Sequence, residues 1–399
     1  MSALKVEATK LLETVNFLAP GFERTGTHIE SQLLHMELVQ NEDGAFMILS
    51  TSNRFVIARQ AIQLSADDVA KDTKFTALIN YETFRGILSL MSDKAVVSMS
   101  VINKGATLKV DADGGVYKFS IESIMFNTTQ PELGTIGKMS YDTFYDMMEN
   151  ARIFTSTDRA SLTGDSIYMS YNDESKTLSA IVYRNSVAAV IDYKIREELE
   201  EKMLPFELTL KASIFKKLAK RTGDLYLLSD AEKTAFGMTV PMGRISMSTL
   251  TGVDSSVSVI TDIMGKNRPY FFELDKDRLS TVLAKISLFA GETVMVEIKD
   301  NKAVFKAVSA KGTDAVESLP CTHLGVLNLE LPIRTVNNVL KLDSATGNIR
   351  FDVDEGGFSA KVSGTSDNIA HTILFSVMGD SDDDEKTQTT PTEAVADEA

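Results

Sequence analysis

The chain has 399 residues, of which 43% are hydrophobic, and a formal net charge of −15. This length predicts two or three domains, because a single hydrophobic core rarely grows beyond roughly 250–300 residues. No stretch approaches the roughly 20 apolar residues of a membrane span, and the N-terminus turns polar too early for a signal peptide. The single cysteine, Cys321, excludes an internal disulfide framework and a multi-cysteine metal site, and we expect it to be buried, in a protein of the reducing cytoplasm.

Six segments carry the periodicity of amphipathic helices, with apolar residues three and four positions apart. Each segment spans two to four turns and needs a sheet to lie on, because isolated helices of that length are marginal in water. The apolar stripes are, in chain order, Leu11, Leu12, Val15 and Leu18; Phe84, Ile87, Leu88 and Met91; Phe144, Met147, Met148 and Ala151; Ile214, Phe215, Leu218 and Ala219; Leu279, Val282, Leu283 and Ile286; and Ile333, Val336, Val339 and Leu340.

Strands of alternating polarity follow the helices. "AVVSMSV", "ATLKVDA" and "VYKFSIESI" follow the second helix, and "NIRFDVD", "FSAKVSG" and "HTILFSV" follow the sixth. The turns between them contain glycine or asparagine, as β-hairpins prefer. "DADGG" (Asp111–Gly115) and "DVDEGG" (Asp352–Gly357) are predicted to be hairpin turns, because neither has the remaining ligands of a calcium loop.

The pattern of one helix and about four strands therefore occurs six times, which predicts three similar domains of two modules each. A period this long indicates a triplicated domain and not a solenoid. The predicted fold class is α+β, with short helices on one face of curved antiparallel sheets. The predicted domains are residues 1–135, 136–264 and 265–378. Residues 379–399 have eight acidic residues and one lysine, and we predict a disordered acidic tail there.

The sequence lacks the common motifs of enzyme active sites. Walker A, G-x-G-x-x-G, H-E-x-x-H and G-x-S-x-G sequences do not occur at positions that would support them. The four histidines, His28, His35, His323 and His371, lack metal-ligand spacing, and we expect them at the surface or at the edge of the core. The sequence therefore predicts no catalytic site, no metal site and no cofactor.

Five stretches resemble segments of the bacterial DNA polymerase III beta sliding clamps in order and spacing. They are "LKVEATKLLETVNFLAPGFERTG", "YKFSIESIMFNTTQPEL", "RASLTGDSIYMSY", "LSTVLAKISLFAGE" and "HTILFSVM". Each motif is weak alone, and the resemblance rests on their sequence of occurrence from Leu4 to Met378. The chain resembles a divergent member of that family, and a bacteriophage origin stays open.

The resemblance implies a ring. Clamps of this family are head-to-tail homodimers in which six domains close a ring around duplex DNA, with helices lining the hole and sheets outside. Three domains per chain favour two chains per ring over three. The implied partners are double-stranded DNA, a second copy of the chain, and a DNA polymerase and clamp loader that bind through a peptide motif. The resemblance implies no membrane and a place at the replication fork in the cytoplasm, or in the host cytoplasm for a phage protein.

A set of basic residues on the helices is predicted to face DNA, which would let an acidic protein enclose phosphates. On the fourth helix they lie opposite the apolar stripe, although an ordinary solvated face remains the alternative. Acidic residues share these helices: Glu7, Glu13, Asp142, Asp146 and Glu149. The predicted DNA-facing residues are Lys10, Arg24, Arg85, Arg152, Lys216, Lys217, Lys220, Arg221, Lys276, Arg278, Lys285, Arg334 and Lys341.

By position in the family, ring closure pairs Phe119 and Ile121 with Leu288 and Phe289 of the second chain. An exposed apolar pair beside an edge strand invites such pairing. An ordinary core position is the alternative for each of these residues, because alternation alone does not identify the partner that covers them.

The family binds partner peptides in an apolar pocket between its second and third domains. The matching positions are Leu162, Val182, Arg184, Val187, Ser256, Ile373, Leu374 and Phe375. Two departures put the peptide specificity in doubt: "VYRNSV" replaces the family's T-D-G-H-R-L, and "FSV" replaces M-P-M. The acidic tail begins beside this position, and we expect it to screen off acidic partners or to modulate docking.

Two other functions stay open on the sequence alone. A structural scaffold of repeated β-rich domains would share the repeat but has no need of basic helix faces. An enzyme with an unrecognised site between domains would need a motif that the sequence does not contain. The sequence therefore favours a processivity factor without chemistry of its own.

Overall fold

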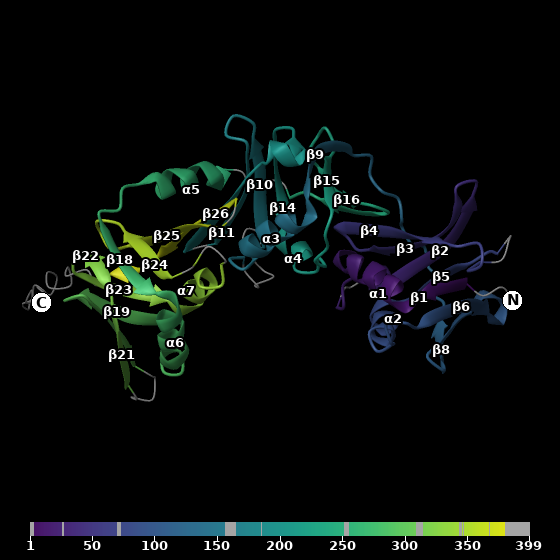
Figure 1. Cartoon of the computed structure of the whole chain (residues 1–399), viewed down its shortest axis with the longest axis horizontal. Coiled ribbons are helices and arrows are strands. Elements are labelled where there is room, and N and C mark those ends of the chain that lie inside the picture. The colour runs from purple at the N-terminus through teal and green to yellow at the C-terminus, as the bar shows by residue number, and fades with distance from the viewer. Residues whose placement is uncertain are drawn as a thin grey trace, which may run out of the picture. The chain divides into compact units, whose positions relative to one another are not determined.

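The computed structural model describes residues 4–25, 28–69, 73–155, 165–184, 186–250, 255–308, 314–342, 345, 347–366 and 368–379. The chain divides into two compact units, and each is described by itself. The first unit comprises Met1–Ile260 with Asp367–Ala370, and the second comprises Thr261–Ser366 with His371–Ala399. Figure 1 shows strands and short helices in both.

The first unit begins with an antiparallel sheet in the order β1-β6-β7-β8. Its strands are β1 (Leu4–Glu7), β6 (Val96–Ile102), β7 (Thr107–Ala112) and β8 (Gly115–Ser120). Helices α1 (Ala8–Phe17) and α2 (Tyr81–Leu88) contact each other near these strands (Figure 1). The Asn80 side chain accepts a hydrogen bond from the backbone N–H of Thr83 at 2.9 Å, which caps the start of α2.

A longer antiparallel sheet of the first unit has the order β13-β9-β15-β16-β17-β4-β3-β2-β5. Its strands are β2 (Leu33–Asn41), β3 (Gly44–Ser52), β4 (Val56–Leu64), β5 (Thr76–Asn80), β9 (Gly134–Ser140), β13 (Lys202–Met203), β15 (Asp224–Ser229), β16 (Ala235–Val240) and β17 (Gly243–Ser248). The pairing of β17 with β4, from Gly243 opposite Gln60 to Met247 opposite Val56, joins the two halves of this sheet.

The first unit also contains four strands in the order β14-β10-β11-β12. They are β10 (Ser166–Asn172), β11 (Thr177–Arg184), β12 (Val187–Lys194) and β14 (Phe206–Lys211). Helices α3 (Tyr141–Arg152) and α4 (Ala212–Phe215) contact each other beside them. The short 3-10 helices of this unit are η1 (Ala19–Gly21), η2 (Ile29–Gln32), η3 (Asn103–Gly105) and η4 (Glu197–Leu199).

The second unit has strands in the orders β26-β25-β24-β18-β22 and β21-β20-β19-β23-β27. These strands are β18 (Tyr270–Asp275), β19 (Thr293–Lys299), β20 (Lys302–Val308), β21 (Asp314–Pro320), β22 (Thr322–Leu324), β23 (Leu327–Pro332), β24 (Asn348–Val353), β25 (Ser359–Ser366), β26 (Ile369–Ser376) and β27 (Met378–Gly379). Helices α6 (Lys276–Ile286) and α7 (Ile333–Val339) contact each other beside them, and α5 (Ser255–Gly265) spans the boundary between the units.

The predicted α+β class is confirmed, and the apolar stripes form the cores. In α3, Phe144, Met147, Met148 and Ala151 are all at most 1% exposed, because positions three and four apart share one helix face. Cys321 is buried, as expected. None of the helices in the described parts of the chain is long and apolar enough to cross a membrane.

Two expectations from the sequence are wrong, and one helix was missed. The fourth predicted helix shrinks to the single turn of α4, which ends at Phe215. Helix α5 was not predicted, because its run of serine and β-branched residues alternates like a strand. His371 is only 2% exposed, since it shares the inward face of β26 with Ile373 and Phe375.

The two acidic hairpin turns form as predicted. In the turn between β7 and β8, Asp113 and Gly114 have φ angles of 48° and 74°. Positive φ at successive turn residues is the geometry that the twist of a two-residue hairpin favours. In the turn between β24 and β25, Gly357 has a φ of 69°.

Candidate nucleic-acid interface

The predicted DNA-facing residues lie on or just beyond the helices, and several of them are held by acidic neighbours. Arg24 lies 3.3 Å from Glu82, Lys220 lies 3.3 Å from Asp146, and Lys285 lies 2.9 Å from Glu317. Arg152 pairs with Glu149 one turn away on α3. Exposed ion pairs of this kind contribute little stability, but they reduce the positive field that a phosphate would meet.

A second group of basic residues is held by neutral oxygens of the protein. Arg85 donates from Nε to the side chain of Asn16 at 2.7 Å, which joins α2 to α1. Lys10 donates to the carbonyl of Gln63 at 3.3 Å. Both side chains remain exposed, so these contacts leave their charges accessible to solvent.

Lys217 and Arg221 are placed differently from what the helix pattern predicted. Because α4 ends at Phe215, both residues lie beyond the helix, and both are half-buried. The Lys217 ammonium donates to the carbonyl of Phe22. The Arg221 guanidinium donates to the carbonyl of Glu13 and to the side chain of Gln60. Burial lowers the pKa of both groups, because a charged group is less well hydrated in these surroundings.

The remaining predicted residues carry accessible charge. Lys216, Arg278, Arg334 and Lys341 are exposed, and Lys276 is half-buried at the start of α6. The ammonium of Lys341 lies 3.5 Å from the side-chain oxygen of Asn338, which is a weak contact. Four of these five residues belong to the second unit, on or just beyond α6 and α7.

The predicted peptide-pocket residues are distributed over both units. Val182 is buried in β11, whereas Arg184 and Val187 are half-buried and face each other across the turn between β11 and β12. Ile373, Leu374 and Phe375 are buried in β26, where the ring of Phe375 meets Phe351 edge-on. Leu162 lies outside the described residues, and so does the side chain of Ser256. That these residues form one pocket stays a prediction.

The predicted dimer residues fall into two kinds. Leu288 is 81% exposed and Phe289 is 37% exposed, just past the end of α6. Phe119 is 7% exposed and packs edge-to-face on Phe84 with ring centroids 5.6 Å apart, as the core alternative expected. Ile121 is half-buried, and its backbone N–H donates to Ala106.

Three exposed apolar residues near the predicted dimer residues were missed by the sequence reasoning. Val116 on β8 and Val316 on β21 are 57% and 65% exposed, and Leu90, two residues after α2, is 88% exposed. The alternation along each strand could have predicted that the two valines are exposed, because each valine is out of phase with the buried positions of its strand.

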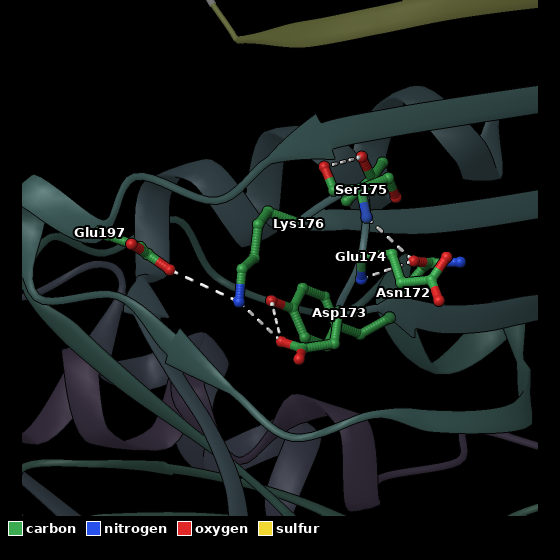
Figure 2. A network of polar contacts seen from close by, with 8 residues as sticks. Asn172, Asp173, Glu174, Ser175, Lys176 and Glu197 are labelled. Atoms are coloured by element: carbon green, nitrogen blue, oxygen red, sulfur yellow. Dashed lines mark hydrogen bonds and ion pairs between the residues drawn. The ribbon is translucent and has the colours of Figure 1, made fainter.

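A further basic residue, Lys176, belongs to a polar network at the turn between β10 and β11 (Figure 2). The Lys176 ammonium lies 2.8 Å from Asp173 and 3.6 Å from Glu197, which precedes the buried Glu201 in the chain. The hydrogen bond from Lys176 lowers the pKa of Asp173. The side-chain oxygen of Asn172 accepts hydrogen bonds from the backbone N–H groups of Glu174 and Ser175, at 2.9 and 3.0 Å, and these bonds fix the turn.

A cavity of about 370 Å³ adjoins this network. Its lining residues are Tyr171, Lys176, Ile195, Glu197, Glu201, Lys202 and Met203. The Glu201 carboxylate accepts from the hydroxyl of Tyr193 at 2.8 Å and from the backbone N–H of Arg196 at 2.9 Å. These contacts anchor the segment between β12 and β14, and the mixed charge of the lining favours neither phosphate nor a cation.

Comparisons with known proteins identify the fold. No family model matches the sequence, and no curated protein matches it either. Among solved structures, the DNA polymerase III subunit beta from Pseudomonas aeruginosa is 12% identical, with a TM-score of 0.78, and the match covers 94% of this chain and 100% of that one. A DnaN sliding clamp from Bartonella birtlesii bound to griselimycin is 10% identical, with a TM-score of 0.79 and coverage of 95% and 100%. The chain therefore has the fold of the DNA polymerase III beta sliding clamps.

Proposed function

We propose that this chain is a DNA sliding clamp, a processivity factor that encircles duplex DNA and tethers a replicative polymerase without catalysing a reaction. The observation that carries the proposal is the fold likeness over 94–95% of the chain, which includes every domain of the solved clamps. The accessible basic residues on α6 and α7 support it, because a scaffold has no need of them.

The proposed phosphate contacts are the basic residues with accessible charge. They are Lys10, Arg85, Lys216, Lys276, Arg278, Arg334 and Lys341. Four further residues, Arg24, Arg152, Lys220 and Lys285, would have to leave an acidic partner before they could contact a phosphate. A lining of this kind suits weak contacts that allow sliding and that fall off steeply with salt.

The proposed ring is a head-to-tail homodimer that closes between β8 of one chain and β21 of its partner. Each is the last strand of its sheet within the described residues, so each presents backbone groups to a further strand. Val116 on β8 and Val316 on β21 would then contribute apolar side chains at the junction. Different surfaces meeting in a head-to-tail manner make a closed ring when the rotation allows it.

The exposed residues after two helices support the same closure. Leu90 follows α2, which packs on the sheet of β8 through Phe84 and Phe119. Leu288 and Phe289 follow α6, which contacts β21. An apolar patch beside each edge strand is what an interface between two copies requires.

The proposed partners are a polymerase and a clamp loader that bind through a short peptide motif. The proposed peptide contacts are Val182, Arg184 and Val187 in the first unit, and Ile373, Leu374 and Phe375 in the second. The acidic residues after Gly379 follow β27 directly in the chain and would modulate docking. Deleting residues 380–399 tests this last point, and an unchanged affinity for a polymerase peptide would contradict it.

Retention on circular DNA tests the clamp function. Diluting the protein, adding nicked circular duplex and concentrating the mixture would let rings close around DNA without a loader. We expect the protein to co-elute with the circle at high salt and to be released when the DNA is cut once. Retention that does not depend on circularity would contradict enclosure, and a particle without a central hole in negative stain would favour the scaffold.

Leu288→Asp tests the proposed closure. We expect this variant to elute as a monomer while keeping its circular dichroism spectrum, because a carboxylate in an apolar junction has no partner. Leu204→Asp is the control, since Leu204 is also apolar and 60% exposed but lies between β13 and β14. A dimer that survives Leu288→Asp would contradict this interface.

A further inference from the structure

The strands β4 and β17 meet at a seam that also carries basic side chains. Besides the five paired positions, the backbone N–H of Ala61 donates to Met242 at 2.8 Å, and that of Ser248 donates to Phe55 at 2.9 Å. The Lys211 ammonium lies 4.3 Å from the centre of the Phe55 ring. Basic residues that follow β9 in the chain therefore contact residues of the segment before it along the β4–β17 seam.

Arg221 makes the most extensive of these contacts. Its Nη2 atom lies 3.1 Å from the Glu13 carbonyl and 3.0 Å from the side-chain oxygen of Gln60. Its guanidinium also lies 4.3 Å from the centre of the Phe17 ring, and Phe17 is only 1% exposed. Glu13 and Phe17 belong to the last turns of α1, where the helix dipole favours a cation. A planar guanidinium can stack and donate at once, which an ammonium cannot.

Lys217 binds the segment that follows α1 and η1 in the chain. Its ammonium donates to the carbonyl of Phe22, which follows η1 and stacks on Tyr81 with ring centroids 4.5 Å apart. Tyr81 in turn donates to the carbonyl of Val15 in α1 at 2.9 Å. Lys217 and Arg221 thus hold two successive parts of the chain around α1.

The neighbouring basic residues of this stretch point elsewhere. Lys216 is exposed, and Lys220 is exposed and pairs with Asp146 on α3. One short stretch therefore contains two residues engaged at the seam and two that are open to solvent, which provides matched variants.

We propose that Arg221 and Lys217 are positioning residues that latch the end of α4 to α1 across the β4–β17 seam, and that they do not contact DNA phosphates themselves. The latch holds α1 and α4, two of the proposed lining helices, in one register. Its effect on DNA retention rests on the proposed function, whereas the latch itself does not.

Amide hydrogen exchange of Arg221→Gln, Arg221→Lys, Lys216→Gln and Lys220→Gln tests the latch. We expect both Arg221 variants to speed exchange about tenfold at Leu18, which directly follows α1, and at Ile57 and Ser246 in the seam, because either change removes the guanidinium contacts. The two lysine variants should exchange like the unaltered protein. Exchange at the unaltered rate in both Arg221 variants would overturn the proposal.

The salt dependence of DNA binding separates positioning from phosphate contact. A lost phosphate contact lowers the slope of log K against log salt by about 0.9. We expect Arg221→Gln to leave the slope unchanged. A slope lowered by that amount in Arg221→Gln and restored in Arg221→Lys would assign Arg221 to phosphate and overturn the proposal.

Gln60→Ala keeps the test decisive if the Arg221 variants fold poorly. It removes one acceptor of the guanidinium and leaves all basic residues in place. We expect faster exchange at the end of α1 and an unchanged salt slope. Unchanged exchange in Gln60→Ala would overturn the latch. If neither the unaltered protein nor any of the variants binds DNA, the proposed function fails. The exchange result still decides whether the latch exists.

Discussion

Basic residues near α4 and basic residues on α6 and α7 have similar positions relative to their helices but different surroundings. Beyond α4, Lys217 and Arg221 are half-buried and donate to carbonyl oxygens of the earlier part of the first unit. On the helices of the second unit, Arg278 and Arg334 are exposed. The difference teaches that a basic residue loses its accessibility where folding buries it against carbonyl oxygens from another part of the chain.

The acidic neighbours refine this comparison. Lys220 and Lys285 are both exposed, yet each lies close to a carboxylate. Lys220 lies 3.3 Å from Asp146, and Lys285 lies 2.9 Å from Glu317. An ion pair at the surface costs little to break, so these residues form an intermediate group. The proposed lining is therefore a graded set of cations and not a uniform positive surface.

The largest expected effect comes from breaking the seam itself. Phe17→Ala removes a buried ring that packs under the Arg221 guanidinium, and we expect the free energy of unfolding to fall by about 3–5 kcal/mol. Urea denaturation followed by circular dichroism measures this. Leu90→Ala removes an exposed side chain and should change the same quantity by less than about 0.5 kcal/mol. A small effect of Phe17→Ala would mean that the seam is loosely packed.

A smaller effect is expected from crowding the same region. A Cβ added at Gly21 would lie 2.7 Å from the carbonyl oxygen of Thr51, so Gly21→Ala should cost about 1–3 kcal/mol of unfolding free energy. Gly86 on α2 has no neighbouring atom within 4 Å of such a Cβ. Gly86→Ala should therefore stabilise by about 0.5–1 kcal/mol, and thermal unfolding of the two variants should shift in opposite directions.

The second region is tested by its charges. Lys276→Ala combined with Arg278→Ala removes two accessible cations from α6, and the salt slope of DNA binding should fall by up to about 1.8 for two phosphates. Lys285→Ala is the matched single variant on the same helix, and its effect should be smaller because Glu317 already neutralises Lys285. Equal effects per residue would show that the ion pair does not persist on DNA.

The smallest expected effect concerns pH. Burial lowers the pKa of His35 below its usual value of 6.5, even though Glu37 raises it, and the imidazole stacks on Phe126. Because the unfolded chain binds the proton more readily, stability should fall as the pH drops below about 6.5 and level off below the lowered pKa. His35→Gln should flatten the dependence of the unfolding free energy on pH. Urea denaturation between pH 5 and pH 8, the range in which histidine ordinarily titrates, measures it. An unchanged curve would assign the pH dependence to other groups.

The sequence by itself determined the fold class and most of the core. Apolar residues at helical spacing, such as Phe144 and Met148, can be buried together only if the segment is a helix on a sheet, so pattern and structure agree. The hairpin turns followed from Asp113 and Gly114, whose positive φ angles few other residues tolerate. These features depend on neighbours along the chain, which the sequence contains directly.

Only the tertiary structure decided which basic residues are accessible and where α4 ends. Arg221 and Arg334 look alike in sequence, and they differ because Glu13 and Gln60 come from segments more than 150 residues away from Arg221. The same reason explains Phe119, whose burial against Phe84 depends on how α2 meets β8. A side chain's role is set by the oxygens and rings that folding brings within hydrogen-bonding or stacking distance, and periodicity along the chain does not contain that information.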